Sequence, residues 1–130
     1  MIDITALLAT SLLFGGMTLY SFGFAPLVFS ALPAKDAGML LRRAFPYYYL
    51  FVVISALAAS LALLPRDLAA AGLMAGTAVV AVIARQVLMP AINTARDSGA
   101  KSRFDRLHGM SIALNMVQLA AVVWVLVRLA

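Results

Sequence analysis

The stretch ITALLATSLLFGGMTLYSFGFAPLVFSAL, residues 4–32, contains no charged side chain. A helix needs about 20 apolar residues to cross the hydrocarbon core of a bilayer, so this stretch predicts a membrane-spanning helix. Three further apolar stretches follow at residues 45–64, 68–92 and 107–128. We therefore expect an all-α integral membrane protein, a four-helix bundle that occupies residues 1–130 as a single transmembrane domain.

The composition of the whole chain agrees with this interpretation. Hydrophobic residues make up 65% of the sequence and the mean hydropathy is +1.02, both unlike an ordinary soluble domain. Backbone amides in a bilayer must be hydrogen-bonded within the protein, which leaves helices or a closed β-barrel. Barrel strands alternate apolar and polar residues. Runs such as residues 50–64 do not alternate, so the sequence favours helices.

The basic residues lie mostly between the apolar stretches, as orientation signals do. Segments on one side of the predicted bundle hold seven of them and the other side holds two, and such an excess is typical of cytoplasmic loops. We expect both termini on the non-cytoplasmic side of a bacterial inner membrane, and no nucleic-acid partner despite the net charge of +5. The seven are Lys35, Arg42, Arg43, Arg96, Lys101, Arg103 and Arg106, and the two are Arg66 and Arg128.

Shorter segments, some between the apolar stretches and some within them, give further structural predictions. Residues 33–44 are expected to form a short interfacial helix with its basic residues toward anionic lipid head groups, and residues 93–106 a mobile cytoplasmic loop. The aromatic cluster at residues 45–49 is typical of an aromatic belt at the membrane surface. Gly72 and Gly76 have the spacing that brings helices close together, either inside the bundle or between two copies.

A polar stripe follows one face of the fourth apolar stretch. His108, Ser111, Asn115 and Gln118 fall within an arc of about 80° on a helix, and unpaired polar groups facing lipid are costly. The stripe is therefore expected to face the other helices. It either joins helices by hydrogen bonds or lines a cavity that opens to the cytoplasm.

Arg85 lies inside the third apolar stretch, and charged residues within spans are candidates for function. No aspartate lies within a predicted span to pair with it, and the chain has no glutamate. Arg85 therefore either extends to the cytoplasmic interface or bonds backbone carbonyls, tyrosine hydroxyls, an anionic lipid or an anionic ligand. Tyr48 and Asn93 map to the same half of the bundle, so these residues together predict a polar vestibule on the cytoplasmic side. The candidate binding residues are Tyr48, Arg85, Asn93, His108, Ser111, Asn115 and Gln118.

The same composition argues against several kinds of chemistry. Without cysteine there is neither a disulfide nor a thiolate metal site, and one histidine supplies only one axial haem ligand per chain. No nucleophile motif or carboxylate pair stands in the spans. We expect no cofactor, no metal site and no catalytic residue, and therefore no enzymatic activity.

A set of short motifs is distributed over nearly the whole chain. They are Gly15-Gly16, FAPLVF at residues 24–29, Ala37-Gly38, Phe45-Pro46-Tyr47-Tyr48, Pro90 with Asn93 and Arg96, and Arg106-Leu107-His108-Gly109 followed by Ser111 and Asn115. In these motifs the chain resembles the family named after transmembrane protein 205. The resemblance implies a small four-helix membrane protein of undefined activity, with Tyr48, His108 and Asn115 as motif positions.

These observations together predict a small inner-membrane protein that binds or moves a small molecule through the vestibule. The alternative is an accessory or assembly subunit of a larger membrane complex, and a haem- or metal-binding membrane protein ranks third. The expected partners are the lipid bilayer and either further copies of the chain or a larger complex.

Overall fold

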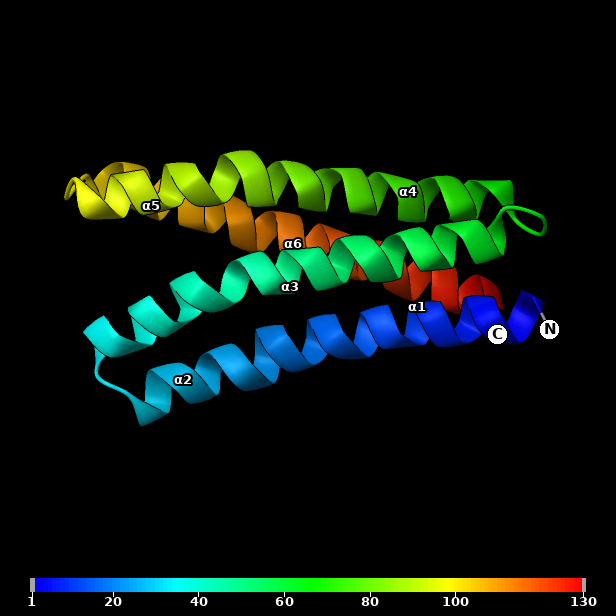
Figure 1. The fold of residues 1–130 in the computed structure, drawn as a ribbon, viewed down its shortest axis with the longest axis horizontal. Coiled ribbons are helices and arrows are strands. Elements are labelled where there is room, and N and C mark those ends of the chain that lie inside the picture. The colour runs from blue at the N-terminus through cyan, green and yellow to red at the C-terminus, as the bar shows by residue number, and fades with distance from the viewer. Residues whose placement is uncertain (1, 130) are drawn as a thin grey trace.

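Each apolar stretch folds as a long helical span in the computed structural model, which describes residues 2–129. The elements in chain order are α1 (Ile2–Thr18), the π-helical η1 (Leu19–Phe24), α2 (Ala25–Ala31), α3 (Ala34–Leu63), α4 (Leu68–Ile83), the π-helical η2 (Ala84–Leu88), α5 (Met89–Asp97) and α6 (Lys101–Leu129). They form four continuous spans that are long and apolar enough to cross a membrane. The predicted all-α architecture with four spans is confirmed for the described residues. The spans run antiparallel, and both ends of the chain lie at the same end of the molecule (Figure 1).

Both π-helical segments stand just before a proline. Proline lacks a backbone N–H, and its ring crowds the carbonyl four residues earlier. In η1 the N–H of Ala25 bonds the carbonyl of Tyr20, five residues back, and the same widened turn recurs in η2. The first and third spans thus continue past Pro26 and Pro90 without a break, and each wide turn carries residues that face a neighbouring span.

The helices extend further toward the basic end of the molecule than the sequence predicts. The second span begins at Ala34 rather than at residue 45, so the expected interfacial helix is continuous with the span as the first part of α3. The third span ends at Asp97 and the fourth begins at Lys101, so the expected loop is almost entirely helical. The prediction was wrong here because charged residues outside the hydrocarbon core continue a helix as readily as apolar ones.

Two contacts join these helix extensions. Both terminal guanidinium nitrogens of Arg42 on α3 donate to the carboxylate of Asp97 on α5, at 2.8 and 2.9 Å. Nη1 of Arg96 donates to the carbonyl of Gly38 at 3.2 Å, where the missing side chain of Gly38 leaves room for the guanidinium. The beginning of α3 is thereby tied to the end of α5.

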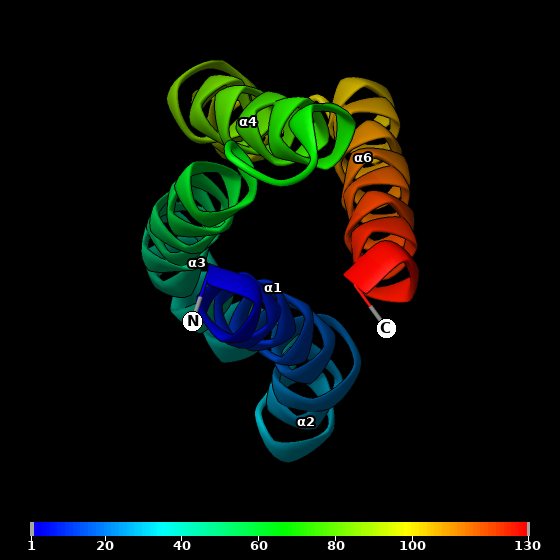
Figure 2. The same ribbon diagram turned by 90° about the vertical axis from the view of Figure 1, so that its right-hand side faces the viewer.

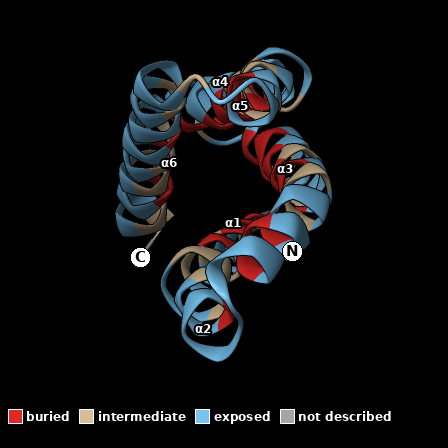
Figure 3. Ribbon diagram, turned by 90° about the vertical axis from the view of Figure 1, so that its left-hand side faces the viewer, coloured by how far each residue is buried: buried red, intermediate tan, exposed pale blue. Residues whose placement is uncertain are grey.

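The four spans follow one another around the molecule in the order α1, α3, α4 and α6, as Figure 2 shows from the end that holds the termini. α3 packs against both α1 and α4, and α6 contacts α1 and α5. Figure 3 shows the buried residues on the inward faces of the helices and exposed residues on the outward faces. Many of the exposed side chains are large and apolar, as expected for a surface in contact with lipid. The largest fully buried side chains include Leu13, Met17, Val52, Met74 and Val122.

Gly72 and Gly76 are exposed and bring no neighbouring helix into close contact. A Cβ built on either glycine would meet no heavy atom within 4 Å, so the interpretation of this pair as a contact inside the bundle is wrong. Gly16 has the role expected of a packed glycine, because the ring of Phe51 on α3 occupies the space beside it. Close approach of the first two spans therefore depends on Gly16.

The link between α3 and α4 is tied to the end of the chain. Oδ1 of Asp67 accepts a hydrogen bond from the N–H of Ala70 at 3.1 Å, capping α4, and Nε of Arg128 donates to Oδ2 at 2.7 Å. The Arg128 guanidinium also lies 4.6 Å from the centroid of the Trp124 ring. The hydrogen bond from Arg128 lowers the pKa of the Asp67 carboxyl below its usual range.

This ion pair predicts a pH-dependent difference between the wild type and Arg128→Gln. Because the pKa of Asp67 is lower in the folded state, the pair stabilises the fold above the ordinary aspartate pKa of about 3.9 and stops doing so as the pH falls through the folded-state pKa. We expect Arg128→Gln to unfold more readily than the wild type at about pH 7, with the difference shrinking below about pH 4. Unfolding in mixed micelles measures it, and a difference independent of pH contradicts the assignment.

Candidate functional site

A cavity with a volume of about 340 Å³ lies between the first span, α3 and α6, on the side of the molecule where α2 and the start of α6 stand. We call it the α2–α6 cavity. Its walls are mainly aromatic and aliphatic, and its polar lining residues come from η1 and α6. The aromatic lining residues are Tyr20, Phe22, Phe29, Phe45, Tyr48 and Tyr49, and the polar ones include Ser21, His108, Ser111 and Asn115.

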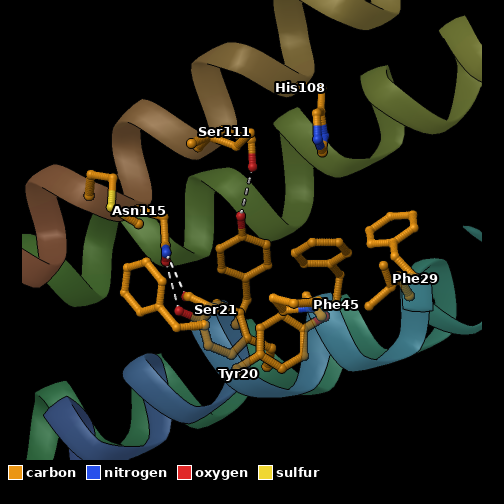
Figure 4. Close-up of a pocket in the computed structure, with 15 residues that line it drawn as sticks. Tyr20, Ser21, Phe29, Phe45, His108, Ser111 and Asn115 are labelled. Atoms are coloured by element: carbon orange, nitrogen blue, oxygen red, sulfur yellow. Dashed lines mark hydrogen bonds between the residues drawn. The ribbon is translucent and has the colours of Figure 1, made fainter. Parts of the chain in front are cut away.

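Asn115 joins three spans through its side-chain amide. The hydroxyl of Tyr48 on α3 donates to Oδ1 of Asn115 at 2.7 Å, and Nδ2 of Asn115 donates to Oγ of Ser21 in η1 at 2.8 Å. Figure 4 shows both bonds on one side of the cavity, with Asn115 reaching across from α6. Asn115 therefore has both roles predicted for the stripe, because it joins helices by hydrogen bonds and also lines the cavity.

A second, longer contact lies one helical turn away on α6. The hydroxyls of Tyr49 and Ser111 are 3.4 Å apart (Figure 4), at the outer limit of hydrogen bonding. Ser111 and Tyr49 are both buried. This pair is therefore held together more weakly than the bonds of Asn115.

Stacked rings form the floor of the cavity. The rings of Tyr20 and Tyr48 are stacked with centroids 4.1 Å apart, and those of Phe45 and Tyr49 are stacked at 6.0 Å. The aromatic-belt interpretation is wrong for Tyr48 and Tyr49, which are 7% and 3% exposed, while Tyr47 is 76% exposed as a belt residue would be. Three consecutive tyrosines thus face two different environments.

His108 lies at the end of the cavity nearest the start of α6. It is exposed, and its ring stacks on Phe104 with centroids 5.6 Å apart. In Figure 4 it points from α6 toward Phe45 and Phe29 across the cavity. His108 is therefore a polar side chain at this end of the cavity lining.

Gln118 does not belong to the α2–α6 cavity. Its Nε2 donates to the carbonyl of Thr77 on α4 at 3.1 Å, and it lines a separate apolar crevice of about 780 Å³ between α4, α5 and α6. We call this the α4–α6 crevice; Gly72, Gly76, Met110 and Val117 also line it. The predicted stripe therefore divides, with His108, Ser111 and Asn115 on the cavity and Gln118 on the crevice.

Arg85 and Asn93 also lie outside the α2–α6 cavity. Nε of Arg85 donates to the carbonyl of Pro46 on α3 at 3.1 Å, and one terminal nitrogen donates to Oε1 of Gln86 at 3.1 Å. The sequence left several roles open for Arg85, and the structure shows the contact with a backbone carbonyl. Asn93 is half-buried on α5 and lines neither the cavity nor the crevice.

The electrostatic character of the cavity differs from the predicted polar vestibule. Its lining contains no lysine, arginine, aspartate or glutamate, and the hydroxyl and amide groups on it bond mainly to one another. Among the side chains that the structure describes, those of residues 4–129, no three histidine or aspartate residues gather where they could hold a metal ion. The arrangement offers flat apolar surfaces beside a few uncharged hydrogen-bonding groups.

Ser21, Tyr20, Phe45 and Tyr49 are site residues that the sequence did not identify. One serine in an uncharged span carries no pattern, and its role depends on the π turn that points it toward Asn115. The only available signal was the proline five residues after it, because a proline inside a span predicts a local change in the helix.

Comparison with known proteins gives a family and no close relative. The model of the family described as a domain of unknown function (DUF4149) matches residues 8–101. The matched range covers the first three spans, including Ser21 and Tyr48, and ends where α6 begins. The search of curated proteins returned no match, and neither did the search of solved structures.

Proposed function

We propose that this chain, which belongs to the family described as a domain of unknown function (DUF4149), is a multi-pass membrane protein. Its proposed role is to bind or move a small molecule. The observation that carries the proposal is the α2–α6 cavity, where Asn115 connects Tyr48 and Ser21 beside an open space. Ligand sites in proteins are typically apolar concavities of about 300–1,000 Å³ with a few placed polar groups. The cavity has both properties.

The proposed role is binding or transport rather than catalysis. A histidine that acts as a base usually has a carboxylate to orient it, and the residues that line this cavity include none to pair with His108. The hydroxyls of Tyr48, Tyr49 and Ser111 contact uncharged partners, and the buried hydroxyl of Tyr20 has no hydrogen-bond partner. These features support recognition of a molecule through hydrogen bonds and ring contacts.

We also propose that the cavity lies in the cytoplasmic half of a bacterial inner membrane, with both termini outside. The support is the gathering of basic residues at the end of the molecule that holds α2 and α5, against Arg66 and Arg128 at the other end. The chain has no cysteine, so single-cysteine variants report one position each. We expect an impermeant maleimide to label Pro65→Cys in intact spheroplasts and Ser102→Cys only after lysis. Labelling in the reverse order contradicts this orientation.

Filling the cavity tests the proposed function. We expect native mass spectrometry of the protein, extracted gently from its own membranes, to show a bound small molecule on the wild type. Ser111→Phe is expected to lose it because the new ring occupies the cavity, whereas Val117→Phe, on the crevice side of α6 and 69% exposed, is expected to keep it. A wild type without a bound molecule, or one that all three proteins carry equally, contradicts the proposal.

A further inference from the structure

The rim of the α2–α6 cavity is apolar and exposed. Phe22 and Phe29 in the first span are 58% and 57% exposed, and Ile112 on α6 is 50% exposed; all three line the cavity. α2 and α6 stand apart at this end of the molecule in both end views (Figures 2 and 3). Exposed apolar side chains are unfavourable in water and favourable among acyl chains, so this opening faces the bilayer rather than the aqueous end of the bundle.

The cavity lining selects for an uncharged ligand. None of its residues is an acid or a permanent base, and a charge buried without a partner is costly in a protein interior or a membrane. The basic residues of this end belong to other contacts or surfaces, as Arg42 does in its pair with Asp97. An anionic or cationic head group would find no counter-charge inside.

The inner walls of the cavity favour a flat ring with an oxygen atom. The stacked pairs Tyr20–Tyr48 and Phe45–Tyr49 present flat ring surfaces, against which a second ring packs well. Asn115 is already engaged in two short bonds, whereas the Ser111–Tyr49 contact is 3.4 Å long. That weak contact is the one a ligand oxygen can replace at least cost.

The volume of the cavity sets the size of the buried part. At about 340 Å³ it is near the lower end of the range for ligand sites, about 300–1,000 Å³. It accepts a ring and its substituents, and a longer apolar tail must leave through the opening between α2 and α6. Such a tail would lie among the acyl chains beside Phe29 and Ile112.

On the premise of the proposed function, we propose that the ligand is an uncharged, membrane-soluble molecule with a ring that carries a hydrogen-bonding oxygen, and that it enters sideways from the bilayer between α2 and α6. The ring lies against the stacked aromatic side chains. Its oxygen bonds Ser111 and Tyr49, and His108 stands at the end of the cavity.

Three probes of similar length test the ligand class on the full-length protein in lipid nanodiscs: decylphenol, decylbenzenesulfonate and dodecanol. We expect native mass spectrometry to show decylphenol retained at least about tenfold more than the sulfonate, because the sulfonate would carry its charge into the cavity. Dodecanol, which lacks the ring, is expected to be retained less than decylphenol. Equal or better retention of the sulfonate overturns the uncharged class, and equal retention of dodecanol overturns the ring.

A bulky rim residue tests the sideways route. Ile112→Trp is expected to reduce retention of decylphenol about tenfold by obstructing the opening, while Val117→Trp on the crevice face leaves it unchanged. Val117→Trp places the same ring on the same helix, so comparing the two variants separates obstruction of the opening from an effect of tryptophan on the fold. Unchanged retention in Ile112→Trp overturns entry between α2 and α6. If the wild type carries its own bound molecule but takes up none of the probes, the ligand class is wrong while the proposed function stands.

Discussion

Asn115→Leu is expected to destabilise the folded bundle by about 1 to 3 kcal/mol, since interhelical hydrogen bonds in membranes average about 0.6 and reach about 1.7 kcal/mol each. The side chain of Asn115 accepts from Tyr48 and donates to Ser21, so one substitution removes the contacts of α6 with two other spans. Leucine has the same branched shape and the same number of side-chain heavy atoms as asparagine, so the change is chiefly one of hydrogen bonding. Reversible unfolding in mixed micelles measures the loss.

Two further variants make this result specific. Asn93→Leu is the matched control, because Asn93 is half-buried on α5 and lines neither the cavity nor the crevice; we expect a change of less than about 0.5 kcal/mol. Adding Tyr48→Phe to Asn115→Leu removes the hydroxyl that the first change leaves without a partner. The double variant is therefore expected to be at least as stable as Asn115→Leu. Additive losses would show that the Tyr48–Asn115 bond is unimportant.

Gly16→Leu is expected to cost about 1 to 3 kcal/mol of stability through overpacking between the first two spans. The ring of Phe51 already fills the space where a side chain at position 16 would begin. A leucine there must push α1 away from α3 or force the ring out of its position. Either movement disturbs the helices that carry Tyr20 and Tyr48, so we expect loss of the bound molecule as well.

Gly15 provides the control on the same helix. A Cβ on Gly15 would meet nothing within 4 Å, and Gly15→Leu is expected to change the free energy of unfolding by less than about 0.5 kcal/mol. Combining Gly16→Leu with Phe51→Ala should recover part of the loss, because it returns the space that the leucine needs. Equal destabilisation by Gly15→Leu and Gly16→Leu contradicts the packing account.

The sequence was sufficient to predict the four spans because hydrophobic length is a property of single segments. Residues 4–32 and the three later stretches each satisfy the bilayer requirement without reference to one another. The ends were predicted less well. Lys35, Arg42 and Arg43 were interpreted as part of a separate interfacial helix, but that helix is the first part of α3, and Arg42 ties it to the end of α5 through Asp97.

The candidate site was only partly predictable because it depends on which spans become neighbours. Of the stripe on α6, Asn115 and Gln118 face other helices as expected, yet not the same ones: Asn115 meets α3 and η1, while Gln118 meets α4. His108 is exposed. Arg85 donates to the backbone carbonyl of Pro46. Every residue has a backbone carbonyl. A sequence pattern therefore gives no sign of this contact.

Ser21 shows that contacts between residues far apart in the chain cannot be recognised from the sequence alone. Its contact with Asn115 joins residues 94 positions apart and requires both the π turn of η1 and the arrangement of the four spans. The vestibule was predicted to be polar because polar residues are easily recognised within apolar stretches of a sequence. The aromatic floor comes from Tyr20, Phe45 and Tyr49, whose rings meet only in the folded chain.

Methionine methyl resonances test most directly whether a molecule occupies the α2–α6 cavity. Met116 lines the cavity and Met110 lines the α4–α6 crevice; both are on α6 and both are exposed, so each serves as the control for the other. The protein, labelled at its methionine methyl groups, is delipidated, placed in nanodiscs of synthetic phosphatidylcholine and titrated with the lipid extract of its own membranes. We predict that the Met116 signal shifts and the Met110 signal does not. A shift of Met110 alone, or of neither methyl, would contradict occupation of the cavity.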